Sequence, residues 1–302
     1  MKIIISGATG LVGSALVPVL LADGHQVTRL VRQQGQAQPK PGTNEALWNP
    51  TTGQIDAGAL EGHDGVVHLA GENVADGRWT EEKKRRIRDS RVKGTKLLAE
   101  TVARFDAPPR VFISASAIGF YGDRGAELVN EDSAPGADFL SGVCREWEAA
   151  ADAARQAGMR VVHLRIGVVL SGKGGALAKM LTPFKLGAGG KVGSGEQYMS
   201  WIALDDVIGA IKHALGNEQI AGPVNLVAPG AATNAEFTKT LGGVLGRPTL
   251  LPVPAFAARL AFGEMADALL LSSARVEPAR LNATGYQFQY PHLEGALRHA
   301  LK

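Results

Sequence analysis

The apolar positions at the start of the chain alternate between two short runs and one helical stripe. Residues 3–5 are three isoleucines, which is typical of a buried parallel strand. Residues 11–22 carry apolar side chains at positions 12, 15, 16, 19 and 20, a spacing that predicts a helix ending before Gly24. Residues 27–31 form the next apolar run, so the chain begins with a strand–helix–strand unit.

The same alternation continues through the middle of the chain. Apolar runs at 66–69, 111–113 and 161–164 predict strands, and the stretches 80–104 and 141–157 predict helices. Residues 33–63 show no long periodicity, and we expect only a turn at residues 50–53 there. Strands that alternate with helices favour a parallel sheet covered on both faces. The predicted fold class is therefore a doubly wound, Rossmann-type α/β domain.

The periodicity becomes weaker in the second half of the chain. A helix is expected near Asp205, and prolines at 248, 252 and 254 suggest a boundary. We therefore expect a dinucleotide-binding domain over residues 1–247 and a smaller, mostly helical part over residues 248–302, packed over the edge of the sheet. The glycine cluster from Gly187 to Gly195 fits an anion-binding turn or, in the simpler interpretation, a turn without a ligand.

Composition and charge narrow the class of protein. The 302 residues are 45% hydrophobic and 20% charged, which is ordinary for a globular chain and unlike a disordered one. The formal net charge of +3 is too balanced to predict a nucleic-acid groove or a patch for anionic membranes. No run approaches the roughly 20 apolar residues that span a bilayer, and the first apolar run is too short for a secretory signal.

The chain contains one cysteine, Cys144, which excludes an internal disulfide and a multi-cysteine zinc site. The seven histidines are scattered without the spacing of metal ligands, so no metal site is expected. We expect a cytoplasmic protein, because such a low cysteine content suits a reducing compartment.

The strongest candidate for a ligand site is the turn between the first strand and the first helix. Gly7 permits a tight turn, Gly10 lets the backbone approach a pyrophosphate, and Gly13 lets the helix pack closely. The helix N-terminus supplies N–H groups and positive dipole charge to the phosphates. The cofactor contacts expected in this turn are Gly7, Thr9, Gly10, Leu11, Val12 and Gly13. A purely structural tight turn is the alternative interpretation.

Further motifs point to a known superfamily. They are His68-Leu69-Ala70-Gly71-Glu72-Asn73, Ser90-Arg91, Gly119-Phe120-Tyr121-Gly122, Trp147-Glu148, Leu164-Arg165-Ile166-Gly167-Val168-Val169-Leu170 and Gly193-Ser194-Gly195. Together with the glycine loop they resemble the extended and atypical short-chain dehydrogenase/reductases. Within that superfamily they resemble the NAD(P)-dependent epimerase/dehydratase-like branch that includes the human epimerase family protein of the 39U group and bacterial relatives. The resemblance covers nearly the whole chain and implies a Rossmann fold and a nicotinamide cofactor.

The end of the second predicted strand indicates which nicotinamide cofactor is bound. NAD-binding proteins of this kind usually place an acidic residue there, on the ribose 2′-hydroxyl. Here the strand ends Arg29-Leu30-Val31-Arg32, and the Arg32 guanidinium could hold a 2′-phosphate, which favours NADP(H). A solvated surface charge is the alternative. The resemblance adds Arg91 as a second cofactor contact, against the alternative of a surface charge on a basic helix.

Ligands bind at the carboxyl ends of parallel strands, which identifies the remaining cofactor contacts. Leu69, Ala70 and Gly71 follow one strand and are expected on the adenosine-ribose side. Glu72 comes next and could touch the ribose or the substrate, or have a structural role. Ser114 ends the following strand near the nicotinamide. The backbone from Arg165 to Val169 could reach the carboxamide.

The catalytic residues of the superfamily are only partly present. The resemblance implies a serine, which Ser116 matches, and a Tyr-x-x-x-Lys pair whose tyrosine transfers a proton while hydride moves. The nearest match to that pair is Val143 and Trp147, which cannot do acid–base chemistry. Tyr121 is the remaining candidate acid; alternatively it packs against the cofactor or a substrate lid. Cys144 fits a small buried hydrophobe better than a nucleophile.

Two functions are compatible with these residues. One is an NADP(H)-dependent oxidoreductase or epimerase-like enzyme acting on a small polar substrate, by superfamily analogy a nucleotide sugar. The other is a non-catalytic NADPH-binding module that acts through a protein partner, for example in cell division. The sequence leaves the oligomeric state open.

Overall fold

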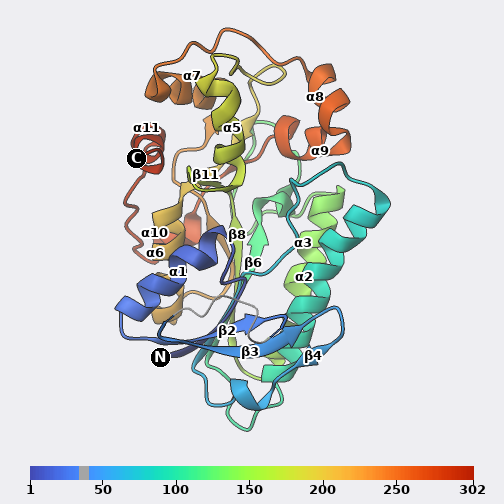
Figure 1. The fold of residues 1–302 in the computed structure, drawn as a ribbon, viewed down its shortest axis with the longest axis vertical. Helices are drawn as coiled ribbons and strands as arrows, with labels where there is room; N and C mark the ends of the chain where they lie inside the picture. The colour runs from blue at the N-terminus through green and yellow to red at the C-terminus, as the bar shows by residue number, and fades with distance from the viewer. Residues whose placement is uncertain (34–40) are drawn as a thin grey trace.

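The computed structural model describes residues 1–33 and 41–302 (Figure 1). A central eight-stranded sheet has the strand order β12-β8-β6-β5-β1-β2-β3-β4. Neighbouring strands are parallel except β3 and β4, which are antiparallel. The strands, in sheet order, are β12 (Gly222–Leu226), β8 (Arg160–Ile166), β6 (Val111–Ala117), β5 (Gly65–His68), β1 (Lys2–Ser6), β2 (Gln26–Val31), β3 (Thr43–Asn49) and β4 (Gln54–Ile55).

Helices cover both faces of the sheet, as the alternating pattern predicted. Figure 1 shows α1 and α6 on one side of β6 and β8, and α2 and α3 on the other. Successive strand residues point to opposite faces, so Ile3 and Ile5 join the core under α1 and α6, while Ile4 joins the core under α2. The covering helices are α1 (Leu11–Ala22), α6 (Leu204–Gly216), α2 (Glu81–Val102), α3 (Phe139–Ala149) and α4 (Asp152–Gln156). The doubly wound fold class is confirmed.

The strand order contains a switch point beside β1. From β1 the chain moves outward through β2 and β3, then returns to pair β5 with the other side of β1 and continues through β6, β8 and β12. The connections after β1 and β5 therefore diverge and leave a crevice at the carboxyl ends of these two strands. Ligands of open α/β sheets bind in such a crevice.

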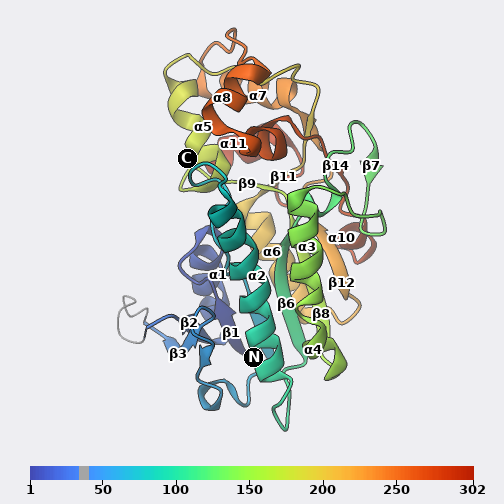
Figure 2. The same ribbon diagram turned by 90° about the vertical axis from the view of Figure 1, so that its right-hand side faces the viewer.

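A mostly helical part lies beyond the carboxyl ends of the strands (Figure 2). Its own core combines Leu170 and Trp201 with Phe237 on α7 and Leu297 on α11. Its helices are α5 (Gly175–Lys185), α7 (Asn234–Leu245), α8 (Ala255–Phe262), α9 (Glu264–Ala266) and α11 (Leu293–Ala300), while α10 (Ala279–Ala283) packs beside β12. Short strand pairs connect it to the sheet: β9 (Val168–Leu170) with β11 (Trp201–Ala203), β10 (Tyr198–Met199) with β13 (Ala232–Thr233), and β7 (Leu128–Val129) with β14 (Arg275–Val276).

Two expectations about local structure were wrong. The stretch 33–63 contains β3 and β4, although residues 34–40 of it lie outside the described residues. The single helix expected over 141–157 is interrupted at Ala150 and Ala151, between α3 and α4. The boundary at residues 247 and 248 stays a prediction. None of the helices in residues 1–33 and 41–302 has the length and apolar character needed to cross a bilayer.

Candidate cofactor and substrate site

The three glycines of the β1–α1 turn differ in how much space surrounds them. Gly7 has a φ of +70°, and a Cβ there would lie 2.8 Å from the backbone nitrogen of Ala70. A Cβ on Gly13 would lie 2.2 Å from the Gly7 carbonyl oxygen. Gly10 is different, since the nearest atom to its added Cβ is 3.4 Å away and its φ of −74° suits any residue. Packing therefore explains Gly7 and Gly13, while the space beside Gly10 is left for another occupant.

In residues 1–33 and 41–302, no side chain caps the first turn of α1. Gly10 is the N-cap and offers no side-chain hydrogen bond, and the first turn holds no acidic residue. Backbone N–H groups at the start of a helix need partners, and the helix dipole favours an anion there. The N–H groups of Leu11, Val12 and Gly13 are therefore suited to bind a phosphate group.

A cavity of about 770 Å³ opens at the switch point. One wall is formed by residues 7–10 and 69–71, which follow β1 and β5, and the other comes from the ends of β2 and β3. Of the expected cofactor contacts, the cavity brings together Gly7, Thr9, Gly10, Arg32, Leu69, Ala70 and Gly71. Arg32 is exposed at its rim. The volume and the uncapped helix fit the adenosine and pyrophosphate part of a dinucleotide.

A buried serine ties the two strand ends together. The Ser6 hydroxyl accepts hydrogen bonds from the N–H groups of Leu69 (3.1 Å) and Ala70 (3.2 Å). Its own proton therefore points to Nδ1 of His68, 2.6 Å away. Burial lowers the pKa of His68 to about 4, so the imidazole is neutral and serves as an acceptor. This arrangement holds the backbone of residues 69–70 against the glycine loop.

Residues at the end of β3 and in the β3–β4 turn also line the cavity and were not predicted from the sequence. They are Trp48, Asn49, Thr51 and Thr52. The Asn49 side chain shapes the turn, because its Oδ1 accepts from the N–H groups of Thr51 (3.1 Å) and Thr52 (3.4 Å). The only available signal was the turn at residues 50–53, which sequence reasoning treated as structural.

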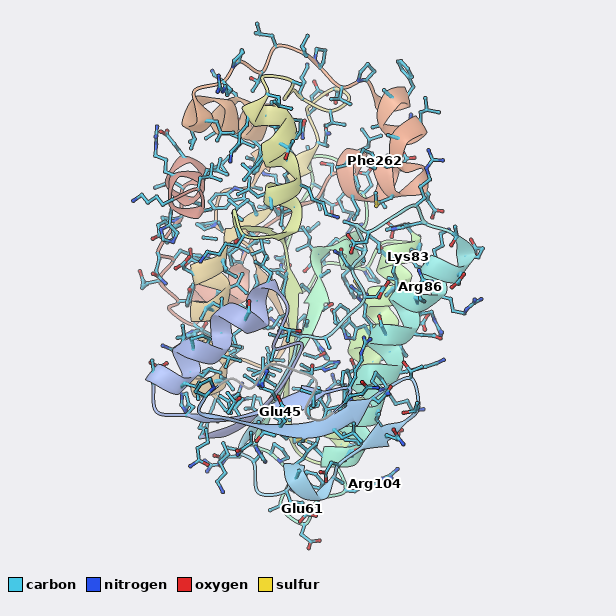
Figure 3. The ribbon with its side chains drawn as sticks, viewed as in Figure 1. Glu45, Glu61, Lys83, Arg86, Arg104 and Phe262 are labelled. Carbon is cyan, nitrogen blue, oxygen red and sulfur yellow. The ribbon has the colours of Figure 1, made fainter. Side chains whose placement is uncertain are left out.

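Glu72 and Arg91 meet at the loop after β5 but face different partners. The Glu72 carboxylate accepts a hydrogen bond from Lys83 at 2.7 Å, which is the main reason that its pKa is lowered. Figure 3 shows Lys83 and Arg86 near the start of α2. Arg91 donates to the Glu72 carbonyl at 3.0 Å and stacks 4.9 Å from the Trp147 ring. Arg91 is thus half-buried against the loop, where burial lowers its pKa, rather than exposed on the helix surface.

The far end of the crevice is a buried network of side chains. Ser116, at the end of β6, donates to Oε1 of Glu148 at 2.8 Å. Arg165 on β8 binds the same carboxylate with two hydrogen bonds of 2.9 Å, from Nε and Nη2. Ser114, two residues earlier on β6, is also buried, and its hydroxyl donates to the Ala115 carbonyl. Arg165 was expected to contribute its backbone, and its side chain proves to be the centre of this network.

Tyr121 belongs to the same network. Its hydroxyl donates to Oδ1 of Asn225 at 2.7 Å and accepts from Nη1 of Arg165 at 3.1 Å. The side chain is fully buried, and burial raises the pKa of the phenol. Ser116 and Tyr121 are therefore brought together through Glu148 and Arg165. Glu148 and Asn225 were not predicted as site residues, since no local pattern connects residues from separate elements.

The chain's relatives agree with this architecture. Residues 3–226 match the NAD dependent epimerase/dehydratase family, and residues 253–300 match a domain of unknown function. An epimerase family protein of Mycobacterium tuberculosis is 44% identical over 98% of this chain and 96% of its own length.

The chain belongs to the NAD dependent epimerase/dehydratase family. Among solved structures, the human epimerase family protein SDR39U1 with NADPH is 37% identical, covers 99% of each chain and superposes with a TM-score of 0.88. A nucleoside-diphosphate sugar epimerase from Corynebacterium glutamicum is 41% identical with a TM-score of 0.81, over 100% of this chain and 58% of that one. The resemblance to the short-chain dehydrogenase/reductase superfamily is thereby confirmed.

Within this epimerase family member, the positions expected for the Tyr-x-x-x-Lys pair are apolar and buried. Val143 is on the buried side of α3. The Trp147 indole N–H donates a hydrogen bond to Oγ1 of Thr95 at 2.9 Å. Cys144 is also buried, and burial raises its pKa to about 12, so the thiol stays protonated near neutral pH. None of these three side chains is suited to transfer a proton near neutral pH.

Two other expected features lie outside this network. Val169 is half-buried in β9, on the side of the crevice near α5. Within the glycine cluster, a Cβ on Gly190 would lie 1.6 Å from the Leu251 carbonyl oxygen. Close packing of two chain segments therefore accounts for a glycine there, in agreement with the interpretation that needs no ligand.

Proposed function

We propose that the chain binds NADP(H) in the crevice between β1 and β5 and transfers hydride between the nicotinamide and a small polar substrate. The observation that carries the cofactor assignment is the cavity with an uncapped helix N-terminus on one side and Arg32 on the other. No acidic side chain lines this cavity among the described residues, so the ribose 2′-hydroxyl has no carboxylate partner. The NADPH in the human relative's structure supports the same choice.

Each predicted contact has a role in this proposal. The N–H groups of Leu11, Val12 and Gly13 bind the pyrophosphate, and Arg32 binds the 2′-phosphate. Residues 69–71 follow the ribose, with Arg91 held against Gly71 by Trp147. Ser114, the backbone near Arg165, and Val169 border the nicotinamide half, while Glu72 positions the loop through Lys83.

The bound cofactor supplies the hydride chemistry, and the polar network supplies the proton chemistry. Ser116 contacts the substrate oxygen at the carboxyl end of β6. Tyr121 contributes by holding Arg165, because both of its hydrogen bonds stay inside the protein. The nucleotide sugars of superfamily relatives remain the leading substrate class by analogy.

Calorimetric titration with NADPH and with NADH tests the cofactor assignment. We expect NADPH to bind at least tenfold more tightly. Equal affinities for the two cofactors would contradict the role given to Arg32. The reaction class is then tested by adding a panel of carbonyl compounds and measuring NADPH oxidation by its absorbance.

The apolar positions of Val143 and Trp147 and the buried phenol of Tyr121 favour a second candidate function. In that alternative the chain holds NADPH and acts through a protein partner without turnover. Tight NADPH binding with no oxidation against any panel compound would favour the module over the enzyme. The single cysteine, Cys144, keeps the cytoplasm as the expected compartment.

A further inference from the structure

A carboxylate lies beside the serine that the proposed function places against the substrate. Glu148 follows the buried Trp147 on α3, and its Oε1 accepts the Ser116 proton at 2.8 Å. A hydroxyl that donates to a carboxylate keeps its lone pairs for other partners. Ser116, which is buried at the end of β6, is therefore arranged to accept a hydrogen bond from a further group.

Arg165 fixes that carboxylate in place. Its two hydrogen bonds to Glu148 are both 2.9 Å, and its guanidinium lies 3.4 Å from the centre of the Phe120 ring. Nη1 is held by the Tyr121 hydroxyl and by the Glu131 carbonyl oxygen. Because all three nitrogens of the guanidinium donate hydrogen bonds and a ring lies against one face, the Glu148 carboxylate can adopt only a narrow range of positions.

The burial of this pair favours a functional interpretation. The Arg165 side chain is 4% exposed and the Glu148 side chain is 13% exposed, so the carboxylate is the more accessible member of the pair. A buried ion pair pays a large desolvation penalty, and well-packed apolar residues often stabilise a fold as well or better. Val143 and Trp147, which are buried on the same helix, are apolar. Stability alone does not explain a carboxylate here.

We propose that Glu148 is a positioning residue for Ser116 and that it receives, through Ser116, the proton of a secondary alcohol substrate. The inference rests on the proposed oxidoreductase function. In the oxidation direction, the substrate C–H bond breaks and its electron pair leaves as hydride for the oxidised cofactor. The substrate O–H proton passes to the Ser116 oxygen, the Ser116 proton passes to Oε1 of Glu148, and the C–O bond becomes C=O. Reduction of the ketone reverses each transfer.

The pair thus does the proton chemistry that a Tyr-x-x-x-Lys pair does elsewhere in the superfamily. The ground-state ligand that suits the site is a hydroxyl, because Ser116 accepts rather than donates.

The test uses the full chain with NADP⁺ and compares Glu148→Gln, Glu148→Asp and Ser116→Ala. Glu146→Gln is the matched control, since Glu146 is on the same helix but exposed and paired with Arg88. Turnover is measured with panels of secondary alcohols and the corresponding ketones. Binding of trifluoroethanol, a hydroxyl probe, is measured by calorimetry as a readout independent of turnover. NADPH affinity and thermal stability are recorded for every variant.

We expect Glu148→Gln to lower kcat by about 100-fold or more, the range for loss of a proton-transfer group, with NADPH affinity within about twofold of wild type. Glu148→Asp should regain part of the activity, and Glu146→Gln should match wild type. Trifluoroethanol should bind at least tenfold more weakly to Ser116→Ala and Glu148→Gln. If Glu148→Gln is unstable, Glu148→Asp retains the charge and carries the comparison.

Three results would overturn the inference. They are wild-type kcat in Glu148→Gln, equal losses in Glu148→Gln and Glu146→Gln, and unchanged trifluoroethanol binding in Glu148→Gln. A wild-type chain that binds NADPH but turns over nothing in either panel contradicts the proposed function instead. In that case trifluoroethanol binding still decides whether Glu148 orients Ser116.

Discussion

The two ends of the crevice differ in whether backbone or side-chain groups form their surface. At the β1–β5 end the ligand surface is backbone, with glycines at positions 7, 10 and 13 and an uncapped helix start beside an open cavity. At the β6–β8 end it is side chain: Ser116 and Arg165, both buried, donate hydrogen bonds to the Glu148 carboxylate, which is 13% exposed. The proposed function uses the first end to bind a large anionic ligand through backbone N–H groups. It uses the second end, where side chains hold a few polar atoms in fixed positions, for the chemistry.

The largest expected effect separates the three glycines at the open end. Gly10→Val should leave the fold intact, because its backbone is in an ordinary conformation and its Cβ meets nothing closer than 3.4 Å. The added side chain occupies the space that the pyrophosphate needs, so NADPH affinity should fall by about 1,000-fold or more, which is about 4 kcal/mol. Calorimetry and thermal unfolding measure the two effects.

Gly13→Val provides the contrasting variant. Its Cβ would lie 2.2 Å from the Gly7 carbonyl oxygen, so it should destabilise the domain itself. If Gly10→Val bound NADPH with wild-type affinity, the backbone end of the crevice would not be the phosphate site.

The next effect concerns two buried histidines, His68 at the end of β5 and His163 in the middle of β8. Burial lowers the pKa of both His68 and His163 to about 4, below the value of about 6.5 expected in an unfolded chain. Between these values the unfolded chain binds more protons, so the free energy of unfolding should fall as the pH falls from about 6.5 toward 4. Each histidine should account for about 2 kcal/mol at pH 5 and about 3 kcal/mol when the transition is complete.

Urea unfolding at a series of pH values measures this dependence. His68→Gln should flatten the curve over the same pH window, and it reports on the end of the crevice where Ser6 holds the loop after β5. A variant curve parallel to that of the wild type would mean that His68 takes up a proton without unfolding.

The same contrast decides what the sequence could reveal. The glycine loop was predictable because its strand, turn and helix are contiguous, and each glycine's role follows from local geometry. The network was only half predictable, since Ser116 and Tyr121 lie in a recognisable segment but Glu148 and Asn225 reach them from other elements. No spacing along the chain encodes a contact between residues so far apart.

The missed strand has a similar explanation. β3 buries only Ala46 and Trp48 and is otherwise polar or partly exposed, so it lacks the β-branched run that marked β1. It forms because β2 offers it a parallel partner, from Val27 opposite Thr43 to Val31 opposite Leu47. Tertiary pairing, not local preference, decides such a strand.

A smaller effect tests the charge at the rim of the open end. Arg32→Asp should weaken NADPH binding by about 1.5–3 kcal/mol, because it removes charge-assisted hydrogen bonds to the 2′-phosphate. NADH binding should be unchanged or stronger. Arg104→Asp is the control, since Arg104 is exposed just after the end of α2 and does not line the cavity (Figure 3). Parallel losses in the two variants would indicate general electrostatics rather than recognition of the phosphate.

The smallest effect tests whether the closed end is held by Tyr121 or uses it as an acid. Tyr121→Phe removes the donor to Asn225 and one partner of Arg165, which should lower the free energy of unfolding by about 1–2 kcal/mol. NADPH affinity should stay within about twofold, because the open end is untouched. Turnover should fall less than in Ser116→Ala, since burial raises the phenol pKa and both hydroxyl partners are internal. Tyr290→Phe, which loses a bond to His299 outside the crevice, controls for the missing hydroxyl. Equal losses of kcat in Tyr121→Phe and Ser116→Ala, with stability unchanged, would make Tyr121 the proton donor and Glu148 its support.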